Sequence, residues 1–533
     1  MRRDFSSLAR GPFDLLVIGG GIYGAWTAYD AALRGLRVAL VERTDWAAGT
    51  SSNSSKLIHG GLRYLERLHF GLVRTSLQER RVLAGLAPHR IQPLRFLIPV
   101  FRGARVGRLR WKLGLSLYDF LAGDGQPVTP HQALSPDEVA ERFPFVRRDA
   151  LVGAFGYGDC VTDDARCTLE IVDGALGAGA AAVNGAEATR LLRDGNRVTG
   201  VEVKDLETGR SLEVQAAVTV SCSGAWSMDV PSRTFSARAR MTKGVHLVLP
   251  PLPTDNALLL LAPSDGRVVF LLPWYGRTLL GTTDTPYTGQ PDAVRVTSED
   301  VDYLLHAANT HVTPSWRTSD VLGGFAGIRV MRNQPHLDPS QVTREWSLDQ
   351  FAPGLLTPLG GKFSTARADS AKTVDRVMKL VGRQAGARPT AERPFPWAPT
   401  GNFVAWLEQA VERGVAVGLD ADTALTSALR FGSRLDDVHE RVRKRPTLAA
   451  RLHPELPFSR AEVEHAVEHE MARSLDDVLR RRIPLTILAR PDARVATDAA
   501  ELVASILGWT QEHTHRQLTH LAAATIGSVE PSS

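Results

Sequence analysis

The sequence predicts an α/β protein with a Rossmann-like dinucleotide-binding fold, an interleaved antiparallel-sheet region that binds substrate, and an all-helical C-terminal domain. An apolar run at residues 13–18 precedes a glycine-rich turn and a helical pattern. Short runs rich in Val, Leu and Thr, separated by Gly and Pro, follow in the middle of the chain. From Phe403 onward, apolar residues recur at spacings of three and four, which is typical of helices.

The first of these elements is a βαβ unit. Residues 13–18 form its first strand, the helical pattern continues to Ala32, and residues 37–41 form the second strand. Gly19, Gly21 and Gly24 form a GxGxxG between strand and helix, where backbone N–H groups and the helix dipole can bind a diphosphate. Glu42 follows the second strand, where an acidic side chain accepts hydrogen bonds from an adenosine ribose. The motif alone does not distinguish NAD from FAD.

The middle and the end of the chain set the expected domain boundaries. Strands are expected at residues 197–204, 216–221, 245–249 and 278–283, interleaved with the nucleotide-binding segments. We therefore assign residues 1–385 to the cofactor- and substrate-binding domain. Residues 386–402 are rich in Pro and polar side chains and predict a linker, and residues 403–533 form the helical domain.

Composition narrows the class of protein. Hydrophobic residues at 43% and charged residues at 23% are typical of a globular fold. The net charge of +5 is too small to indicate nucleic acid, although it suits an anionic substrate or lipid surface. No apolar run approaches the roughly 20 residues that cross a bilayer. Cys160, Cys167 and Cys222 form no CxxC pair, so free thiols and a cytoplasmic location are expected.

The segment GTSSNSSKLIHGGLRYLE, residues 49–66, favours a flavin over a nicotinamide. Its hydroxyls, among them Ser52, and the Lys56 ammonium can donate to phosphates and to the isoalloxazine edge. His59 stands beside Gly60 and Gly61, whose backbone can approach a flat ring closely.

This segment resembles the flavin-contacting signature of the FAD-dependent glycerol-3-phosphate dehydrogenase family. Further matching motifs follow in order: YGDCVTDDAR from Tyr157, KGVHLVLP from Lys243, LLPWYGRTLLGTTDTPY from Leu271, GIRV from Gly327, TREW from Thr343 and GGKFSTAR from Gly360. Residues 456–482 resemble the family's helical C-terminal domain, so the resemblance covers nearly the whole chain.

The resemblance implies FAD as cofactor and sn-glycerol 3-phosphate as substrate. It places Gly360, Gly361 and Lys362 near the flavin and Gly224 near the adenosine. The implied substrate set is Arg63, Tyr64, His246, Arg329, Arg344 and Lys362. Guanidinium groups and an ammonium are the side chains that bind phosphate oxygens best, so this set suits a small phosphorylated polyol. The resemblance also implies a membrane quinone as electron acceptor, and it leaves a homodimer open.

Oxidation of a secondary alcohol by a flavin needs a proton acceptor. Neutral histidine is suited to this near neutral pH, so we expect His246 to be the base, with His59 as its rival. Arg329 stays protonated and is expected to stabilise the developing alkoxide.

Departures from the family pattern keep alternatives open. Val330 and Met331 stand where the family usually has Pro-Leu, Ala366 stands at a usual tyrosine and Ala225 at a common proline. Another hydroxy-compound dehydrogenase, an amine or amino-acid oxidase of the same fold, and a non-catalytic flavin-binding protein therefore remain alternatives.

Two further patterns in the sequence concern metal binding and membrane binding. His465 and His469 lie four residues apart, but HAVEH lacks the order of HExxH, so no metal site is predicted. In residues 105–121, apolar side chains fall along one expected side of a helix with basic residues between them: Val106, Leu109, Leu113, Leu117 and Leu121. This helix could lie on an anionic membrane surface or pack on the substrate region.

Overall fold

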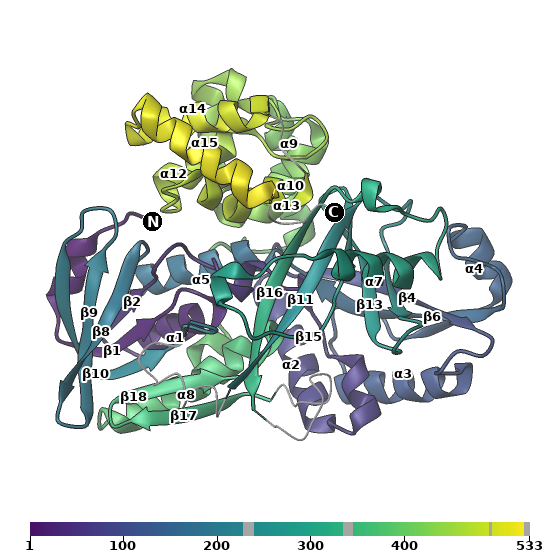
Figure 1. Ribbon diagram of the computed structural model, residues 1–533, viewed down its shortest axis with the longest axis horizontal. Helices are drawn as coiled ribbons and strands as arrows, with labels where there is room; N and C mark the ends of the chain where they lie inside the picture. Colours follow the sequence, from purple (N-terminus) through teal and green to yellow (C-terminus); the bar gives the residue numbers. More distant parts are fainter. Residues whose placement is uncertain (227–238, 334–344, 490–492, 527–533) are drawn as a thin grey trace.

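The computed structural model describes residues 1–226, 239–333, 345–489 and 493–526. Figure 1 shows two sheets side by side, with a helical domain lying across one edge of both. Strands that alternate along the chain thus separate in space into two sheets. One is the sheet expected to bind the nucleotide, and the other is largely antiparallel.

The first sheet is built on the predicted βαβ unit. Strand β1 (Phe13–Ile18) pairs in parallel with β2 (Val38–Val41) and β10 (Ser211–Ser221). Its other strands are β7 (Ala181–Val183), β8 (Ala186–Asp194), β9 (Arg197–Asp205), β17 (Ser347–Ala352) and β18 (Leu355–Leu359). Helices α1 (Ile22–Leu33), α5 (Asp164–Gly177) and α8 (Ala366–Leu380) share a buried core with the parallel strands.

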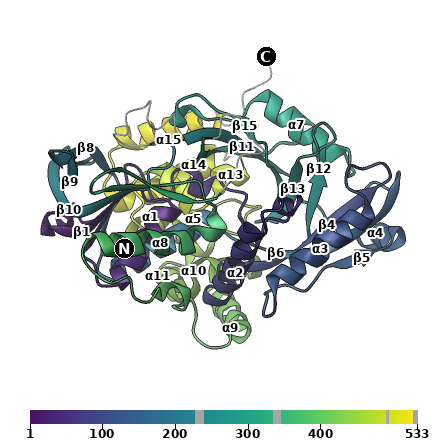
Figure 2. The same cartoon turned by 90° about the horizontal axis from the view of Figure 1, so that it is seen from below.

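The second sheet lies beside the first. Its strands are β3 (Leu57–Ile58), β4 (Gln92–Phe101), β5 (Gln132–Leu134), β6 (Leu151–Val161), β11 (Ala239–Leu249), β12 (Ala257–Leu261), β13 (Val268–Trp274), β14 (Arg277–Gly281), β15 (Thr285–Pro286) and β16 (Gly323–Arg332). Helices α4 (Pro136–Arg142) and α7 (Ser298–Asn309) cover one face. Helices α2 (Phe70–Leu86) and α3 (Arg108–Ala122) cross the region seen from below in Figure 2.

The helical domain has a small core of its own, which includes Phe431 and Val438, and it shares a larger one with the second sheet. Its helices are α9 (Phe403–Ala416), α10 (Ala421–Phe431), α11 (Leu435–Lys444), α12 (Arg460–His469), α13 (Leu485–Leu488), α14 (Ala493–Leu507) and α15 (Gln511–Ile526). Phe458, Leu479 and Leu485 are buried in one cluster with Leu272 of β13 and Phe325 of β16. Because apolar side chains of both regions fill one interior, the helical domain is fixed on the second sheet.

The predicted fold class is confirmed, and the differences are local. The sheets and helices occur where the two periodicities indicated them, but β10 and β11 begin earlier than expected because the residues before each apolar run continue the pairing with β9 and β16. Strand β11, for example, begins at Ala239, ahead of the expected Val245. A short helical turn, η7 (Pro389–Ala391), interrupts the segment expected to be a linker.

The three cysteines are free, as expected. Among the described residues, no helix is both long and apolar enough to cross a bilayer.

Candidate functional site

One large cavity dominates the part of the chain that the structure describes. Its volume is about 870 Å³, and it lies where the carboxyl end of β1, the end of β16 and the helical domain meet. Of the predicted site residues it is lined by Gly19, Gly21, Glu42, His59, Gly61, Arg63, Tyr64, Gly224, Arg329, Gly360, Gly361 and Lys362. Residues from all parts of the chain are therefore brought to one space.

At one end of the cavity lies the glycine turn between β1 and α1, where the backbone leaves no space for a side chain at two positions. Gly19 has a φ of 103°, and a Cβ on Gly24 would come within 1.9 Å of the Gly19 carbonyl oxygen, so Gly24 lets helix and strand approach without itself lining the cavity. At the start of α1 the Ile22 N–H donates to Ser51 Oγ at 2.9 Å. Gly21 and the N-terminus of α1 thus open onto the space, as a diphosphate would need.

Glu42 lies at the same end. Its carboxylate accepts hydrogen bonds from the N–H of Gly20 at 2.7 Å and of Thr44 at 2.8 Å. Burial raises the pKa of Glu42 above its ordinary value, although these hydrogen bonds oppose the rise. Gly224 and Trp226 line the cavity nearby, and the Trp226 indole donates to Asp292 at 2.9 Å. This end has the shape and the acceptor expected for an adenosine.

The glycine-rich loop contributes less directly than its sequence predicts. His59 and Gly61 line the cavity, whereas Ser52, Lys56 and Gly60 do not. The Lys56 ammonium, 1% exposed, lies 2.6 Å from Asp164 and donates to the Ser52 carbonyl. The structure thus gives this buried ammonium a carboxylate partner, and its expected role as a donor to the cofactor stays a prediction. The Gly60 N–H donates to the hydroxyl of Tyr118 at 2.9 Å.

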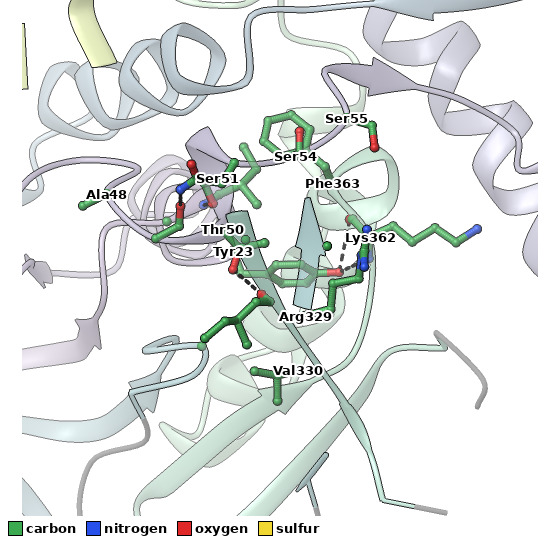
Figure 3. A pocket seen from close by; sticks show the side chains of 18 of the residues that line it. Tyr23, Ala48, Thr50, Ser51, Ser54, Ser55, Arg329, Val330, Lys362 and Phe363 are labelled. Atoms are coloured by element: carbon green, nitrogen blue, oxygen red, sulfur yellow. Dashed lines mark hydrogen bonds between the residues drawn. The ribbon is translucent and has the colours of Figure 1, made fainter. Parts of the chain in front are cut away.

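At the other end, glycines again permit a close approach. Gly61, Gly360 and Gly361 have φ values of 79°, 73° and 86°. A Cβ on Gly361 would fall 1.8 Å from the hydroxyl oxygen of Tyr23, so no other residue fits there. Figure 3 shows the hydroxyl of Tyr23 bonded to Lys362, whose backbone N–H donates to it at 3.1 Å. This leaves room for a planar ring against the backbone.

Three cationic side chains from different segments face this end. The Lys362 ammonium lies 4.0 Å from the centre of the Tyr64 ring, and the Arg63 guanidinium lies 5.3 Å from the same ring. Arg329 donates to the Thr282 hydroxyl at 2.9 Å and lies 3.3 Å from Asp284. Thr282 and Asp284, both in the motif GTTD at residues 281–284, thus orient Arg329. An anionic ligand would find its charge complement here.

His246 lies one layer behind the cavity wall. It is 2% exposed, and its ring stacks at 4.8 Å on Phe325, which does line the cavity. His246 Nε2 lies 2.9 Å from the hydroxyl oxygen of Ser55, another lining residue. Burial, with the charges of Arg329 and Lys56, holds the pKa of His246 well below its ordinary value. The imidazole is therefore neutral, as a proton acceptor must be, and it meets the cavity through Ser55.

Other predicted residues fall outside this site. Arg344 lies outside the described residues. Of the departures from the family pattern, Val330 and Met331 line the cavity, whereas Ala225 and Ala366 do not.

The described residues contain no group of three or more His, Cys, Asp or Glu side chains placed to hold a metal ion. His465 is buried beside Glu470 at 3.5 Å.

Sequence reasoning missed several lining residues. Tyr23 lies within the GxGxxG and Ser55 within residues 49–66, but nothing in the spacing of either motif marks these two as lining residues. Asp476, Arg480, Arg481 and His520 come from the helical domain, which carried no predicted site residue. The run of three arginines from Arg480 is visible in the sequence, but a basic run ordinarily means a solvated surface.

Comparison with known proteins agrees with this geometry. A family model described as FAD dependent oxidoreductase matches residues 14–363, and one described as the C-terminal domain of alpha-glycerophosphate oxidase matches residues 372–514. The chain is 34% identical to a glycerol-3-phosphate dehydrogenase of Mycobacterium leprae (strain TN), covering 95% of this chain and 87% of that protein. It is 34% identical to one of Synechocystis sp. (strain ATCC 27184 / PCC 6803 / Kazusa), covering 97% of each.

Solved structures give the same result. The glycerol-3-phosphate dehydrogenase from Bacillus halodurans complexed with FAD superposes with a TM-score of 0.80 at 28% identity, covering 98% of this chain and 96% of that one. Glycine oxidase from Geobacillus kaustophilus, with a TM-score of 0.53 at 20% identity over 70% of this chain and 96% of its own, shares the fold alone.

A glycine turn for a diphosphate, an acidic ribose acceptor and a glycine-walled ring site define an FAD-dependent oxidoreductase. FAD is its cofactor, and the residues of the cavity fit it. Within that class, the chain belongs to the family of FAD-dependent glycerol-3-phosphate dehydrogenases.

Proposed function

We propose that this protein oxidises sn-glycerol 3-phosphate to dihydroxyacetone phosphate, with hydride passing to N5 of the flavin. One observation carries the proposal: Arg63, Arg329 and Lys362 converge on the ring end of the cavity. A phosphate dianion together with the negative charge that develops on the reacting oxygen matches three cations, whereas an amino acid would need only one or two charge partners. The names of the 34% identical relatives support the same substrate.

The residues would divide the work as follows. Arg63 and Lys362, held over Tyr64, bind the phosphate. Arg329, fixed by Thr282 and Asp284, stabilises the negative charge that develops on the substrate oxygen. Flavin, when bound, supplies the redox chemistry.

His246 accepts the hydroxyl proton in this proposal. Because its ring does not reach the cavity, the proton passes to Ser55 Oγ while the proton of Ser55 passes to His246 Nε2, 2.9 Å away. His59 remains the rival, since it lines the cavity directly.

We also propose that electrons leave to a quinone in a membrane against which the protein lies. The supporting observation is a stripe of exposed apolar side chains on α3: Leu109 is 71%, Leu113 64% and Phe120 81% exposed. Leu68, 72% exposed, directly follows the turn η3 (Leu62–Arg67), which α3 contacts. Exposed apolar residues of this number, next to Arg108 and Lys112, suit the surface of an anionic bilayer.

Anaerobic mixing tests the substrate. FAD-loaded protein is mixed with glycerol 3-phosphate, and the visible flavin absorbance is followed; rapid bleaching supports the proposal. Glycine, mixed in the same way, tests the amino-acid oxidase alternative. If glycine bleaches the flavin and glycerol 3-phosphate does not, the substrate assignment is wrong; no bleaching by either favours a non-catalytic flavoprotein.

A further inference from the structure

The helical domain reaches the cofactor cavity at a run of three consecutive arginines, of which Arg480 and Arg481 line the cavity. Arg480, Arg481 and Arg482 end a single π-helical turn, η10 (Asp477–Arg482), which joins the helical domain to the segment packed on the second sheet. Turns of this kind are rare and occur often at functional sites. Arg481 and Arg482 share one carboxylate partner, whereas Arg480 meets a different residue.

Two of the three arginines are matched by carboxylates. Arg482 binds Asp45 with two hydrogen bonds of 2.7 and 2.8 Å, and Arg481 reaches the same carboxylate at 2.7 Å. Arg481 is also paired with Asp476 and Asp477. Asp45 is fully buried and lies three residues after Glu42, the expected acceptor for the ribose. These ion pairs fix the turn against the start of the cofactor loop.

Arg480 has a different environment. Its guanidinium donates to Asn53 Oδ1 at 2.9 Å, at the far end of the same loop. Among the residues that the structure describes, no carboxylate lies within 4.0 Å of it. It is half-buried and lines the cavity. Asp476 is the carboxylate that acts most strongly on Arg480, but it is paired with Arg481 at 2.5 Å. A half-buried cation that shares its carboxylate with another arginine is stabilised when a further anion approaches it.

The neighbourhood of Asn53 indicates which anion that is. Ser51, two residues earlier, accepts from the first N–H of α1, next to the glycine turn where the cofactor's diphosphate is expected. The substrate phosphate is the other anion of the cavity, but the cations assigned to it belong to the ring end.

We propose that Arg480 is a cofactor-positioning residue supplied by the helical domain: it fixes Asn53 of the loop and adds positive charge to the cavity wall that faces the diphosphate of FAD. This rests on the cofactor and not on the identity of the substrate. The helical domain is then a structural part of the flavin site, linked to both ends of residues 45–53.

Two substitutions separate charge from hydrogen bonding. Arg480→Gln removes the charge and keeps a donor for Asn53, and Asn53→Asp places a carboxylate against Arg480 and neutralises it. Protein freed of FAD is titrated with FAD, and flavin fluorescence gives the dissociation constant. We expect each variant to bind FAD roughly tenfold more weakly, because each removes or neutralises one positive charge beside the diphosphate. The effect should shrink as salt is raised.

The matched control is Arg473→Gln. Arg473 also belongs to the helical domain, but it pairs with Glu207 at 2.7 Å on the surface and does not line the cavity. It should leave FAD affinity unchanged. Apo-protein melting temperatures of Arg480→Gln and Asn53→Asp near that of the wild type would show that the folded loop persists.

Three results would overturn the proposal. FAD affinity could be unchanged in both variants, or it could fall in Arg473→Gln as much as in Arg480→Gln. It could also stay constant while binding of glycerol 3-phosphate to the FAD-loaded protein weakens, which would assign Arg480 to the substrate phosphate. None of these readouts depends on turnover.

Discussion

His246 illustrates how much a single buried residue can decide. Its neutral state follows from burial and from the nearby charges of Arg329 and Lys56. We predict that His246→Gln binds FAD normally but reduces it at least roughly 100-fold more slowly, the range for loss of a general base. Stopped-flow bleaching measures this, with His59→Gln as the parallel variant. A normal rate in His246→Gln together with a slow one in His59→Gln would assign the base to His59.

The pH dependence of the same step has a definite sign. A base must be unprotonated, and the pKa of His246 lies well below its ordinary value of 6.5. The rate of flavin reduction should therefore stay level as pH falls through 6.5 and decline only well below it. A decline centred near 6.5 would point to a solvent-accessible histidine. Folding stability is linked in the same direction: it falls with pH below 6.5, where the unfolded chain binds the extra proton.

Arg329 depends on its neighbours for orientation. Asp284 is 3% exposed and lies 3.3 Å from the guanidinium, so Asp284→Asn should loosen Arg329 without removing it. We predict that this substitution raises the apparent KM for glycerol 3-phosphate, or lowers kcat, by roughly tenfold while FAD stays bound. Asp265→Asn is the control, because the exposed Asp265 pairs with Arg267 and not with Arg329. Equal effects of the two substitutions would remove the special role of Asp284.

At this scale the sequence predicted the residues that short motifs mark, and it failed where partners come from afar. Gly19, Gly21, Glu42 and Lys362 all line the cavity. The partner of Lys56, Asp164, lies in another motif, YGDCVTDDAR, and no spacing in the sequence indicates that pairing. That motif supplies buried ion pairs: Asp163 meets Arg430 and Arg166 meets Glu470, both in the helical domain.

Among the elements, α3 shows what a helical pattern leaves undecided. The expected apolar side of residues 105–121 was wrong as a single face. Val106 is buried ahead of the helix, and Leu115 and Tyr118 form the buried face of α3. Leu109 and Leu113 lie exposed instead. Periodicity predicts the helix. Because α3 has apolar side chains on both faces, periodicity does not predict which face packs against the rest of the protein.

The exposed face of α3 gives a prediction about membranes. Leu113→Asp should reduce sedimentation with vesicles containing anionic lipid by several-fold, because a charge replaces buried hydrocarbon contact. Val404→Asp is the matched control, since Val404 on α9 is equally exposed at 64%. Arg108→Glu and Arg110→Glu together should weaken binding further and reduce its salt dependence. If all variants sediment like the wild type, α3 does not contact the membrane.

For the whole molecule, buried ion pairs between the domains set stability. Arg166, fully buried, lies 2.7 Å from Glu470. Arg166→Gln leaves that carboxylate buried without its partner, so we predict a loss of about 3–5 kcal/mol in the free energy of unfolding. Urea denaturation measures it, with Arg190→Gln, a surface pair, as control. A loss no larger than that of the control would mean that the pair does not stabilise the interface.

Acid should reveal the same pair. Although burial alone would raise the pKa of Glu470, the charge of Arg166 holds it well below its ordinary value of 4.5. The stability that this pair contributes is present above pH 4.5 and is lost as pH falls below it. Arg166→Gln should flatten this part of the pH–stability curve.

The shared interior of the helical domain and the second sheet has a consequence for synthesis on the ribosome. Leu521, near the end of the described chain, belongs to the same buried cluster as Phe155 and Leu259. Strands made early therefore present apolar side chains to water until the last helices emerge. A nascent chain of this protein would need shielding of that surface through most of its translation, and one stopped before α14 would be prone to aggregate.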